Sequence, residues 1–427
     1  MRIDKEQLKE HNQQGLAEHQ RLFGFLAESL DKKGVDVNQV MHQLHQLQVA
    51  IPSWALGAGG TRFGRFAMGG EPGTLEQKID DIGMLKALTQ ATSSVSLHIP
   101  WDIPSNAEAI KSQATELGIK FDAVNSNTFQ DQQDQSHSYK FGSLADNDCM
   151  VREQAINHNL EVIKYGEILG SKSITVWLAD GASFPGQNNF KRAFRNTESS
   201  LHKIYEGLPV DWKMLIEYKP YEPNFYSTVI QDWGTSLMLA ESCGEQAYTL
   251  VDLGHHLPNT NIEQIVATLI MRGRLGGFHF NDSKYGDDDL TCGSIKPYQL
   301  FLICSEIIGG MQDNDSGNPA LEWMIDASHN LKDPLEDLIQ SLEAIRMAYA
   351  QALIVDREAL YEAQMSKDVS HCQEILQDAY RTDVRPLLAE VRRLNGGALN
   401  PMDSYRKMDV REKLITERGK NVVATGL

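Results

Sequence analysis

Eight short apolar runs, separated by stretches with helical spacing, limit most strongly how this chain can fold. The runs occupy residues 48–54, 94–100, 120–127, 173–180, 213–219, 248–256, 276–282 and 321–330. Between them, segments such as TLEQKIDDIGMLKALTQAT and NIEQIVATLIMRGRLG repeat apolar residues three and four positions apart, which predicts helices. Strands that alternate with helices pair in parallel through right-handed crossovers, and eight such units form a (β/α)8 barrel. The sequence therefore predicts an α/β fold of the TIM-barrel type, and an open doubly wound sheet is the weaker alternative because the chain lacks the pattern G-x-G-x-x-G.

Both ends of the chain have helical spacing. The first 45 residues are polar and amphipathic, and the chain after about residue 335 continues with stretches such as LEDLIQSLEAIRMAYAQALIVDREALYEAQ and HCQEILQDAYRTDVRPLLAEVRRLNG. We therefore divide the chain into an N-terminal helical segment (1–45), a (β/α)8 barrel (46–335) and a C-terminal helical extension (336–427). The extension is expected to wrap around the barrel or a neighbouring subunit.

The balance of charge excludes several classes of partner. Lysine and arginine number 40 and aspartate and glutamate 58, which gives a formal net charge of −18. Without a basic stripe, such a surface repels nucleic acid and anionic membranes, so neither is an expected partner. The five cysteines are scattered and form no C-x-x-C, which favours a reducing compartment over a disulfide framework. The polar N-terminus MRIDKEQLKEHNQQ has no apolar signal core, and no apolar run approaches a membrane span, so we expect a cytoplasmic protein.

Chemically active side chains follow the predicted strands at the ends where TIM barrels carry their sites. The residues at these ends are Trp54, His98, Asn125, Trp177, Glu217 with Lys219, Asp252 with His255, His279 and Asp326, and Asp287 and Asp289 come shortly after the seventh run. Each of them alone is more often a helix cap, an ion-pair partner, a hydrogen-bonded histidine or a packed core residue. Together, so many carboxylates cannot share a partly desolvated rim without cations. Bound divalent metal is the expected counter-charge, and oxygen-rich sites with imidazoles suit Mn²⁺, Mg²⁺, Co²⁺ or Zn²⁺.

Spacing within this rim favours the same interpretation. Asp287 and Asp289 are two residues apart and could act as a pair on one ion. Asp252 and His255 are three apart across a glycine, which lets a carboxylate and an imidazole reach one metal as the chain turns. The rim therefore has the residues for more than one metal ion.

Several longer motifs occur in a fixed order along the chain. They are SLHIPWD, TVWLADG, EYK, DLGHH, FHFNDSKYGDDDL and MIDASHN. In these motifs and their spacing the chain resembles the L-rhamnose isomerases, specifically the branch with broad aldose specificity within the xylose-isomerase-like barrels. The resemblance extends from about IPSWALGAGGTRFGRF into the C-terminal helices. It implies a two-metal enzyme that assembles as a homotetramer.

Carried over residue by residue, the resemblance implies two metal sites and a sugar cleft. The structural metal would be held by Glu217, Asp252, His279 and Asp326, and the catalytic metal by His255, Asp287 and Asp289, with Asp252 bridging both. Lys219 would hydrogen-bond the sugar oxygen at the reacting end, and Trp54, His98 and Trp177 would line the cleft. Phe63, in TRFGRF, resembles the aromatic residue that a neighbouring subunit inserts into the cleft.

These residues fit an aldose–ketose isomerase, which moves one hydrogen between C1 and C2 of a sugar. We expect two divalent metal ions, Mn²⁺ ahead of Zn²⁺, Co²⁺ and Mg²⁺, and L-rhamnose and related aldoses as substrates converted by a metal-assisted hydride shift. Lys219 adds positive charge where negative charge develops on oxygen, and His98 is a candidate for ring opening or hydroxyl binding. The alternative route is an enediol, with Asp326 and Ser328 orienting a water that moves the hydrogen as a proton.

Three other functions are compatible with a barrel of this type. A ketose 3-epimerase needs a pair of glutamates on opposite faces of C3, whereas the strand ends offer one glutamate and ligands for two metals. A metal-dependent DNA-repair endonuclease conflicts with the charge of −18. A non-catalytic metal- or sugar-binding barrel would have no need of Lys219.

Overall fold

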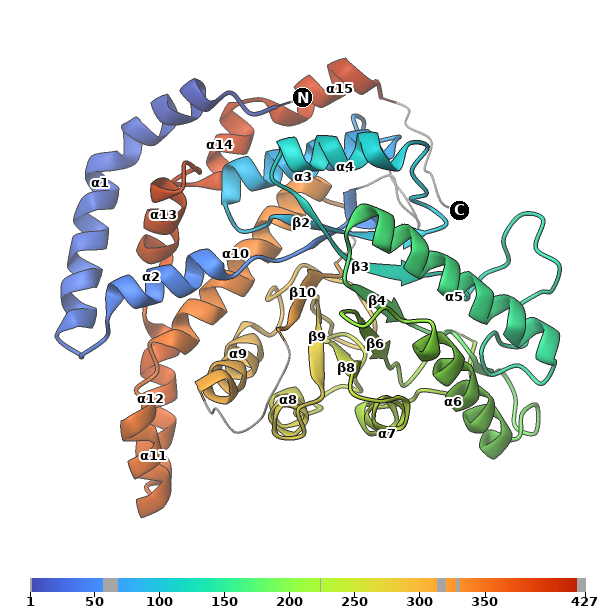
Figure 1. Ribbon diagram of the computed structural model, residues 1–427. Helices are drawn as coiled ribbons and strands as arrows, with labels where there is room; N and C mark the ends of the chain where they lie inside the picture. Colours follow the sequence, from blue (N-terminus) through green and yellow to red (C-terminus); the bar gives the residue numbers. More distant parts are fainter. Residues whose placement is uncertain (1, 57–67, 223, 313–319, 328–330, 421–427) are drawn as a thin grey trace.

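A barrel of eight parallel strands forms the centre of the protein (Figure 1). The computed structural model describes residues 2–56, 68–222, 224–312, 320–327 and 331–420. The strands are β1 (Ile51–Pro52), β2 (Ser94–Ile99), β3 (Lys120–Ser126), β4 (Ser173–Val176), β6 (Lys213–Glu217), β8 (Ala247–Asp252), β9 (Leu275–Phe280) and β10 (Glu322–Ile325). Each of the eight predicted runs overlaps one of these strands, and each strand pairs in parallel with the next one in the order given. The predicted (β/α)8 fold is confirmed.

The first and last strands meet beside Ala50. A parallel bridge joins Ala50 to Met324. The backbone N–H of Ala50 donates to the carbonyl of Trp323 at 2.6 Å, and the N–H of Ile325 donates to the carbonyl of Ala50 at 3.1 Å. These bonds join the two outer strands of the sheet, as a barrel requires.

Helices follow the strands and cover the outside of the barrel (Figure 1). They are α3 (Leu75–Thr89), α4 (Ala107–Glu116), α5 (Cys149–Leu169), α6 (Phe190–Glu206), α7 (Trp233–Cys243), α8 (Ile262–Met271), α9 (Pro297–Gln312) and α10 (Pro334–Leu353), with a single 3-10 turn η1 (Ser53–Leu56) after β1. Because helices cover the strands from outside and side chains fill the barrel inside, residues such as Ile216, Val251 and Phe278 are fully buried. The strands therefore read as nearly continuous apolar runs in the sequence.

Short polar side chains set where several helices begin. The carboxylate of Asp232 accepts a hydrogen bond from the N–H of Thr235 at 2.7 Å, so α7 starts at Trp233. Asp356 accepts from the N–H of Ala359 at 2.9 Å and begins a new helix inside the predicted stretch 335–364. The C-terminal region is therefore a series of short helices instead of two long ones.

A small two-stranded antiparallel sheet lies beyond the barrel strands. It pairs β5 (Gly181–Ala182) with β7 (Ser227–Thr228). A Cβ at Gly181 would lie 2.0 Å from the carbonyl oxygen of Ser227, so this close pairing requires glycine. The sheet ties together the segments that follow β4 and β6, both of which carry residues of the site described below.

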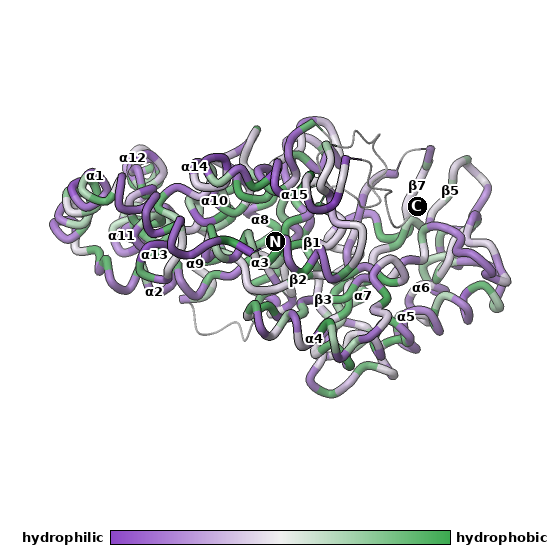
Figure 2. The backbone as a smooth tube through the Cα atoms, turned by 90° about the horizontal axis from the view of Figure 1, so that it is seen from above, coloured by the Kyte–Doolittle hydropathy of each residue, from purple (hydrophilic) through white to green (hydrophobic). Residues whose placement is uncertain are grey.

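The two ends of the chain form further helices outside the barrel. They are α1 (Lys5–Asp31) and α2 (Val37–Gln46) from the N-terminus, and α11 (Arg357–Ser366), α12 (Val369–Arg381), α13 (Arg385–Leu394), α14 (Pro401–Lys407) and α15 (Val410–Arg418) from the C-terminus. Seen from above, α1 and α11–α13 gather on one side and the β5–β7 sheet lies on the other (Figure 2). No helix in the described ranges combines the length and the apolar character needed to cross a membrane. The division of the chain at residues 45 and 335 stays a prediction.

The last helices return to the barrel through buried ion pairs, which we call the C-terminal ion-pair cluster (Asp81, Asp333, Arg411 and Arg418). Arg418 of α15 donates to both oxygens of Asp81 on α3 at 2.8 and 2.6 Å. Arg411 of the same helix donates to Asp333 at 2.8 Å. The cluster fastens α15 against the start of α3 and the start of α10.

Candidate active site

A pocket of about 190 Å³ opens at the carboxyl ends of the barrel strands. Charged and aromatic side chains dominate its lining, which consists of Trp54, His98, Trp101, Asn125, Ser126, Phe129, Thr175, Trp177, Glu217, Lys219, Glu222, His255, His279, Asp287, Asp289 and Asp326. In a parallel barrel the strand ends meet at one rim, so residues far apart in the sequence come together here.

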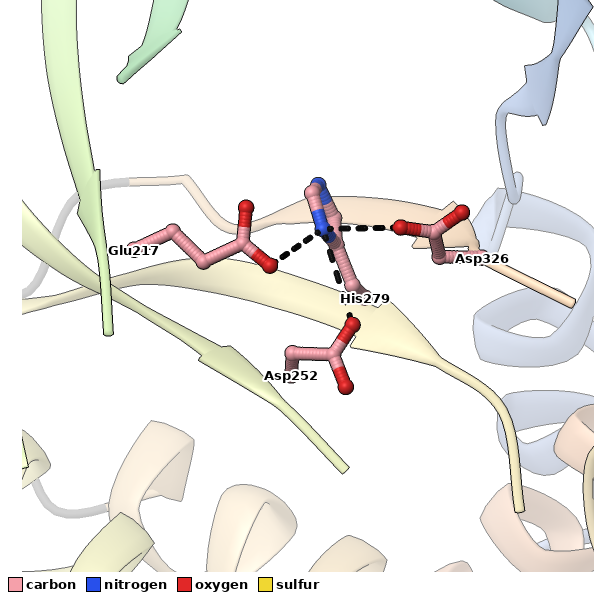
Figure 3. A group of neighbouring side chains, drawn as sticks. All are labelled: Glu217, Asp252, His279 and Asp326. Carbon is pink, nitrogen blue, oxygen red and sulfur yellow. Dashed lines mark hydrogen bonds and ion pairs between the residues drawn. The ribbon is translucent and has the colours of Figure 1, made fainter. Parts of the chain in front are cut away.

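Four of these strand-end residues form a first ligand group (Figure 3). Glu217 and Asp252 are the last residues of β6 and β8, His279 lies on β9, and Asp326 follows β10. One ligand atom from each lies within 4.8 Å of the others. Nδ1 of His279 is 3.2 Å from Glu217, 3.5 Å from Asp326 and 3.8 Å from Asp252. Three carboxylates and one imidazole thus point at a common point.

Asp252 also belongs to a second group, together with His255 and Asp287. His255 lies in the turn three residues after Asp252, and its Nε2 is 3.4 Å from Oδ1 of Asp287. Lys219 lies beside this group, with its Nζ 2.6 Å from Asp287 and in contact with Glu222. The two groups therefore share one carboxylate, and a buried cation borders the second.

Hydrogen bonds hold the shared carboxylate in place. The side-chain amide of Asn281 donates to Oδ1 and Oδ2 of Asp252 at 2.9 and 3.2 Å, and the N–H of Gly254 donates to Oδ1 at 2.7 Å. Donors of this kind orient a carboxylate without neutralising its charge.

Crowded negative charge shifts the pKa values of the first group. Burial alone would lower the pKa of His279, but the carboxylates of Glu217, Asp326 and Asp252 raise it to about 9. Burial and the charges of Asp289, Asp252 and Glu217 raise the pKa of Asp326 to about 7, although His279 opposes them. A cation bound beside Asp326 would favour the charged form of this carboxylate.

The donor set fits divalent metal ions. Carboxylate oxygens with one imidazole suit Mn²⁺, Mg²⁺, Co²⁺ or Zn²⁺, and two groups joined by one carboxylate suit a pair of ions. The carboxylates of Glu217, Asp326 and Asp252 raise the pKa of His279 to about 9, which reflects the negative charge gathered at this rim. Both groups can therefore hold a metal.

Aromatic side chains form the other part of the pocket. His98, on β2, stacks on Trp101 with ring centroids 4.1 Å apart and meets Trp54 edge-on at 5.5 Å. Phe129 contacts both His98 and Trp177. Burial, together with the charges of His158 and Lys78, lowers the pKa of His98 to about 3, so this imidazole is neutral at pH 7.

Most of the residues predicted from the sequence lie at this site. The pocket lining includes Trp54, His98, Trp177, Glu217, Lys219, His255, His279, Asp287, Asp289 and Asp326, and Asp252 joins them through both ligand groups. Asp289 lines the pocket but belongs to neither group of ligand atoms, unlike its predicted partner Asp287. Phe63 and Ser328 lie outside the described residues.

Some lining residues were missed from the sequence. Trp101 and Phe129 come from the segments after β2 and β3, and Glu222 comes from the segment after β6. Each follows a strand end by only a few residues, in HIPWD, SNTFQ and EYKPYEP. Position after a strand could have suggested them, but spacing alone does not reveal which loop residues turn inward.

Comparison with known proteins identifies relatives of this chain. No family model matches the chain. A protein named "probable sugar isomerase" from Mesorhizobium japonicum is 49% identical over 417 residues, which cover 97% of this chain and 96% of that protein. Another of the same description from Rhizobium meliloti is 50% identical over 394 residues, covering 92% and 91%.

Solved structures with the same fold are more distant. A 3-keto-D-glucoside 4-epimerase from E. coli is 12% identical with a TM-score of 0.52, over 70% of this chain and 99% of that one. An L-ribulose 3-epimerase is 13% identical with a TM-score of 0.51, over 75% and 97%. At such identities these two show the fold alone, whereas the close relatives cover nearly the whole chain. This chain belongs to the family of those probable sugar isomerases.

Proposed function

We propose that this protein is a metal-dependent aldose–ketose isomerase that converts L-rhamnose to L-rhamnulose and accepts related aldoses. The observation that carries the proposal is the pair of ligand groups that share Asp252, with Lys219 beside the second. The names of the two close relatives support a sugar isomerase. The choice of L-rhamnose rests on the sequence motifs that resemble that family.

Two ions, of which Mn²⁺ is our first choice, would supply Lewis-acid polarisation of the two sugar oxygens at the reacting carbons. We assign Glu217, Asp252, His279 and Asp326 to one ion and Asp252, His255 and Asp287 to the other, and the resemblance adds Asp289, which lines the pocket, to the second set. The carboxylates at the strand ends have fixed positions, which would determine where each ion lies.

The remaining side chains bind and orient the sugar. Lys219 offers a buried ammonium group that can donate a hydrogen bond to a sugar oxygen as negative charge develops there. His98 is neutral, and its Nδ1 has no hydrogen-bond partner among the described residues, so it is available to a sugar hydroxyl. The indole rings of Trp54 and Trp177 provide flat apolar faces for C–H groups and for the methyl group of a deoxy-sugar.

We propose that the hydrogen moves from C2 to C1 as a hydride while the hydroxyl proton of O2 passes to O1, because Lys219 stabilises charge on oxygen and no free base is then needed at carbon. The competing enediol route would use Asp326 and Ser328 to position a water. Isomerisation in D₂O, followed by NMR of the carbon-bound hydrogens, separates the two. A direct shift leaves C1 and C2 almost free of deuterium, whereas substantial deuterium at either carbon would establish the enediol route.

A ketose 3-epimerase is the second candidate, and Glu222 favours it. Glu222 lines the pocket together with Glu217, which provides the second glutamate that the strand ends alone lack. Incubation with L-rhamnose and, separately, with a ketohexose distinguishes the two functions. Formation of a ketose from L-rhamnose supports the isomerase. Formation of a C3 epimer from the ketohexose, without turnover of the aldose, would show that the protein is an epimerase instead.

Glu222→Gln sharpens this choice. In the isomerase, Glu222 acts through its contact with Lys219, so the variant should keep measurable aldose turnover. In the epimerase, Glu222 would move a proton at C3, so the variant would lose epimerisation.

The resemblance further suggests a homotetramer in which Phe63 of one subunit reaches the pocket of a neighbour, and the scattered cysteines suggest a cytoplasmic location. We propose this assembly for the protein. Phe63→Ala should then raise the KM of deoxy-sugars more than that of fully hydroxylated sugars, since an apolar contact to a methyl group contributes about 1–3 kcal/mol. A monomer in light scattering, with unchanged activity in this variant, would refute the proposal.

A further inference from the structure

One buried carboxylate outside the two ligand groups is connected to the aromatic part of the pocket. Asp102 lies in the turn after β2 and is 2% exposed. Its Oδ2 accepts a hydrogen bond from the backbone N–H of His98 at 2.9 Å and another from the hydroxyl of Ser53. Its own N–H donates to the carbonyl of His98 at 2.9 Å. Asp102 thus fixes the backbone of His98 on both sides.

The residues that Asp102 holds carry or adjoin three rings, which we call the aromatic wall (Trp54, His98 and Trp101). Trp101 is the neighbour of Asp102 in the chain and stacks on His98. Trp54 follows Ser53, touches His98 edge-on, and donates from Nε1 to Oδ1 of Asp326 at 2.9 Å. The wall therefore joins Asp102 on one side to the first ligand group on the other.

Lys78 supplies the opposite charge for Asp102. It projects from α3, and its Nζ lies 2.6 Å from Oδ1 of Asp102, with both side chains almost fully buried. A buried ion pair is held in a fixed geometry, and loss of one partner leaves an uncompensated charge that the surroundings must move to accommodate. The pair thus connects an outer helix to the turn that carries the wall.

We propose that Lys78 and Asp102 are positioning residues that hold the aromatic wall in the geometry in which it binds a sugar. Neither residue lines the pocket, so they act through Ser53, His98 and Trp101. The substrate class rests on the proposed function. The positioning role itself is independent of which sugar is used.

Fluorine NMR of protein labelled with 5-fluorotryptophan tests the wall directly. The resonances of Trp54, Trp101 and the remote Trp212 are assigned with single Trp→Phe variants. Lys78→Met removes the charge and keeps the stem, and we expect it to shift or broaden the Trp54 and Trp101 signals while that of Trp212 stays in place. Ser53→Ala removes one hydrogen bond without changing charge, and we expect it to move the Trp54 signal even if Lys78→Met does not fold.

Lys213→Met is the matched control. Lys213 forms an ion pair with Glu322 at 2.5 Å, at the start of β6 and therefore at the opposite end of the barrel. This variant should leave the Trp54 and Trp101 signals unmoved. The proposal is overturned if neither Lys78→Met nor Ser53→Ala moves them, or if Lys213→Met moves them equally.

Kinetics give a second, separate readout. With L-rhamnose and Mn²⁺, Lys78→Met should lower kcat/KM roughly ten- to hundredfold, mainly through KM, as expected when a binding surface is misplaced. The metal content should equal that of the wild type. A fall in kcat alone at unchanged KM would contradict a role in sugar binding. If the wild-type protein turned over no aldose at all, the proposed function would fail, and the NMR experiment would still decide the positioning role.

Discussion

The C-terminal ion-pair cluster and the pocket rim are two buried groups of charged side chains, and they differ in how many cations of the chain accompany their carboxylates. In the C-terminal ion-pair cluster, Asp81 pairs with Arg418 and Asp333 pairs with Arg411, so each carboxylate has its own guanidinium. At the pocket rim, six carboxylates share one lysine and two histidines among the described residues, namely Glu217, Glu222, Asp252, Asp287, Asp289 and Asp326 with Lys219, His255 and His279.

The difference distinguishes charged side chains that stabilise the fold from charged side chains that can bind a ligand. In the cluster, an arginine side chain of the same chain pairs with each carboxylate, and the pair holds two helices together. Burial, together with the neighbouring carboxylates, raises the pKa of Asp326 to about 7, and those carboxylates raise the pKa of His279 to about 9, so a bound cation would stabilise the charged carboxylates of the rim. Substitutions in the cluster should therefore lower the stability of the fold, whereas substitutions at the rim should lower the rate of turnover.

The largest effect is expected for Asp252→Asn, because Asp252 is the carboxylate that both ligand groups share. We expect isomerisation to fall at least about a thousandfold, which corresponds to about 4 kcal/mol, with less bound metal at both sites. Metal analysis and initial rates measure this, and Asp287→Asn should cost less because only the second group contains Asp287.

Asp333→Asn is the control for this change in the ion-pair cluster. It removes a carboxylate of the same size, and it should lower stability while leaving metal content and turnover intact. Two bound metals and normal rates in Asp252→Asn would refute the ligand assignment.

Arg418→Met tests the cluster itself. The side chains of Arg418 and Asp81 are each 2% exposed, so the variant leaves a buried carboxylate unpaired. We expect the free energy of unfolding to drop by roughly 3 kcal/mol, the low end for such a loss. Urea unfolding measures it, and turnover per folded molecule should change little. An unchanged unfolding midpoint would mean that the pair contributes nothing to stability.

Lys219→Met removes the corresponding cation at the rim. We expect kcat to fall about a hundredfold, close to 2.7 kcal/mol, because the variant loses a preorganised donor to developing charge on oxygen. Metal content and the unfolding midpoint of the metal-loaded protein should hardly change. A variant that lost its metals instead would show that Lys219 serves as a structural counter-charge.

The smallest effect concerns pH and His98. Burial and nearby positive charge lower the pKa of His98 to about 3 in the folded protein, whereas an unfolded histidine titrates near ~6.5. As the pH falls from about 6.5 to about 5, His98 binds a proton in the unfolded chain but not in the folded protein. The free energy of unfolding should therefore drop by roughly 2 kcal/mol. Urea unfolding at both pH values should show a drop smaller by this amount in His98→Gln than in the wild type. An equal drop in both proteins would contradict the buried, neutral state, and His42→Gln, at an exposed position on α2, is the control.

Much of the fold was predictable because barrel strands are apolar on both faces. All eight strands appeared as apolar runs, and most of the rim followed from the rule that sites lie at strand ends. Helix limits were less predictable, since a single capping carboxylate such as Asp232 or Asp356 decides them against the apolar spacing. Helices α6 and α9 were not predicted.

The parts of the site that the sequence did not indicate depend on how the loop residues pack. Glu222 enters the pocket through its contact with Lys219, and its position in EYKPYEP gives no sign of that. The pair of Lys78 and Asp102 joins residues 24 positions apart on a helix and in a turn. Asp287 and Asp289 are close in sequence, but only Asp287 joins the second ligand group, and Asp289 adopts a positive φ of 47°. Packing of the whole rim determines which of these side chains join the site.

The most direct test of the two-metal account is the conversion of L-rhamnose to its ketose by metal-stripped protein, followed as Mn²⁺ is added back. The account predicts no turnover after chelation and full recovery when two Mn²⁺ ions are bound per chain. Full activity in the metal-stripped protein, or full recovery with a single bound ion, would contradict it.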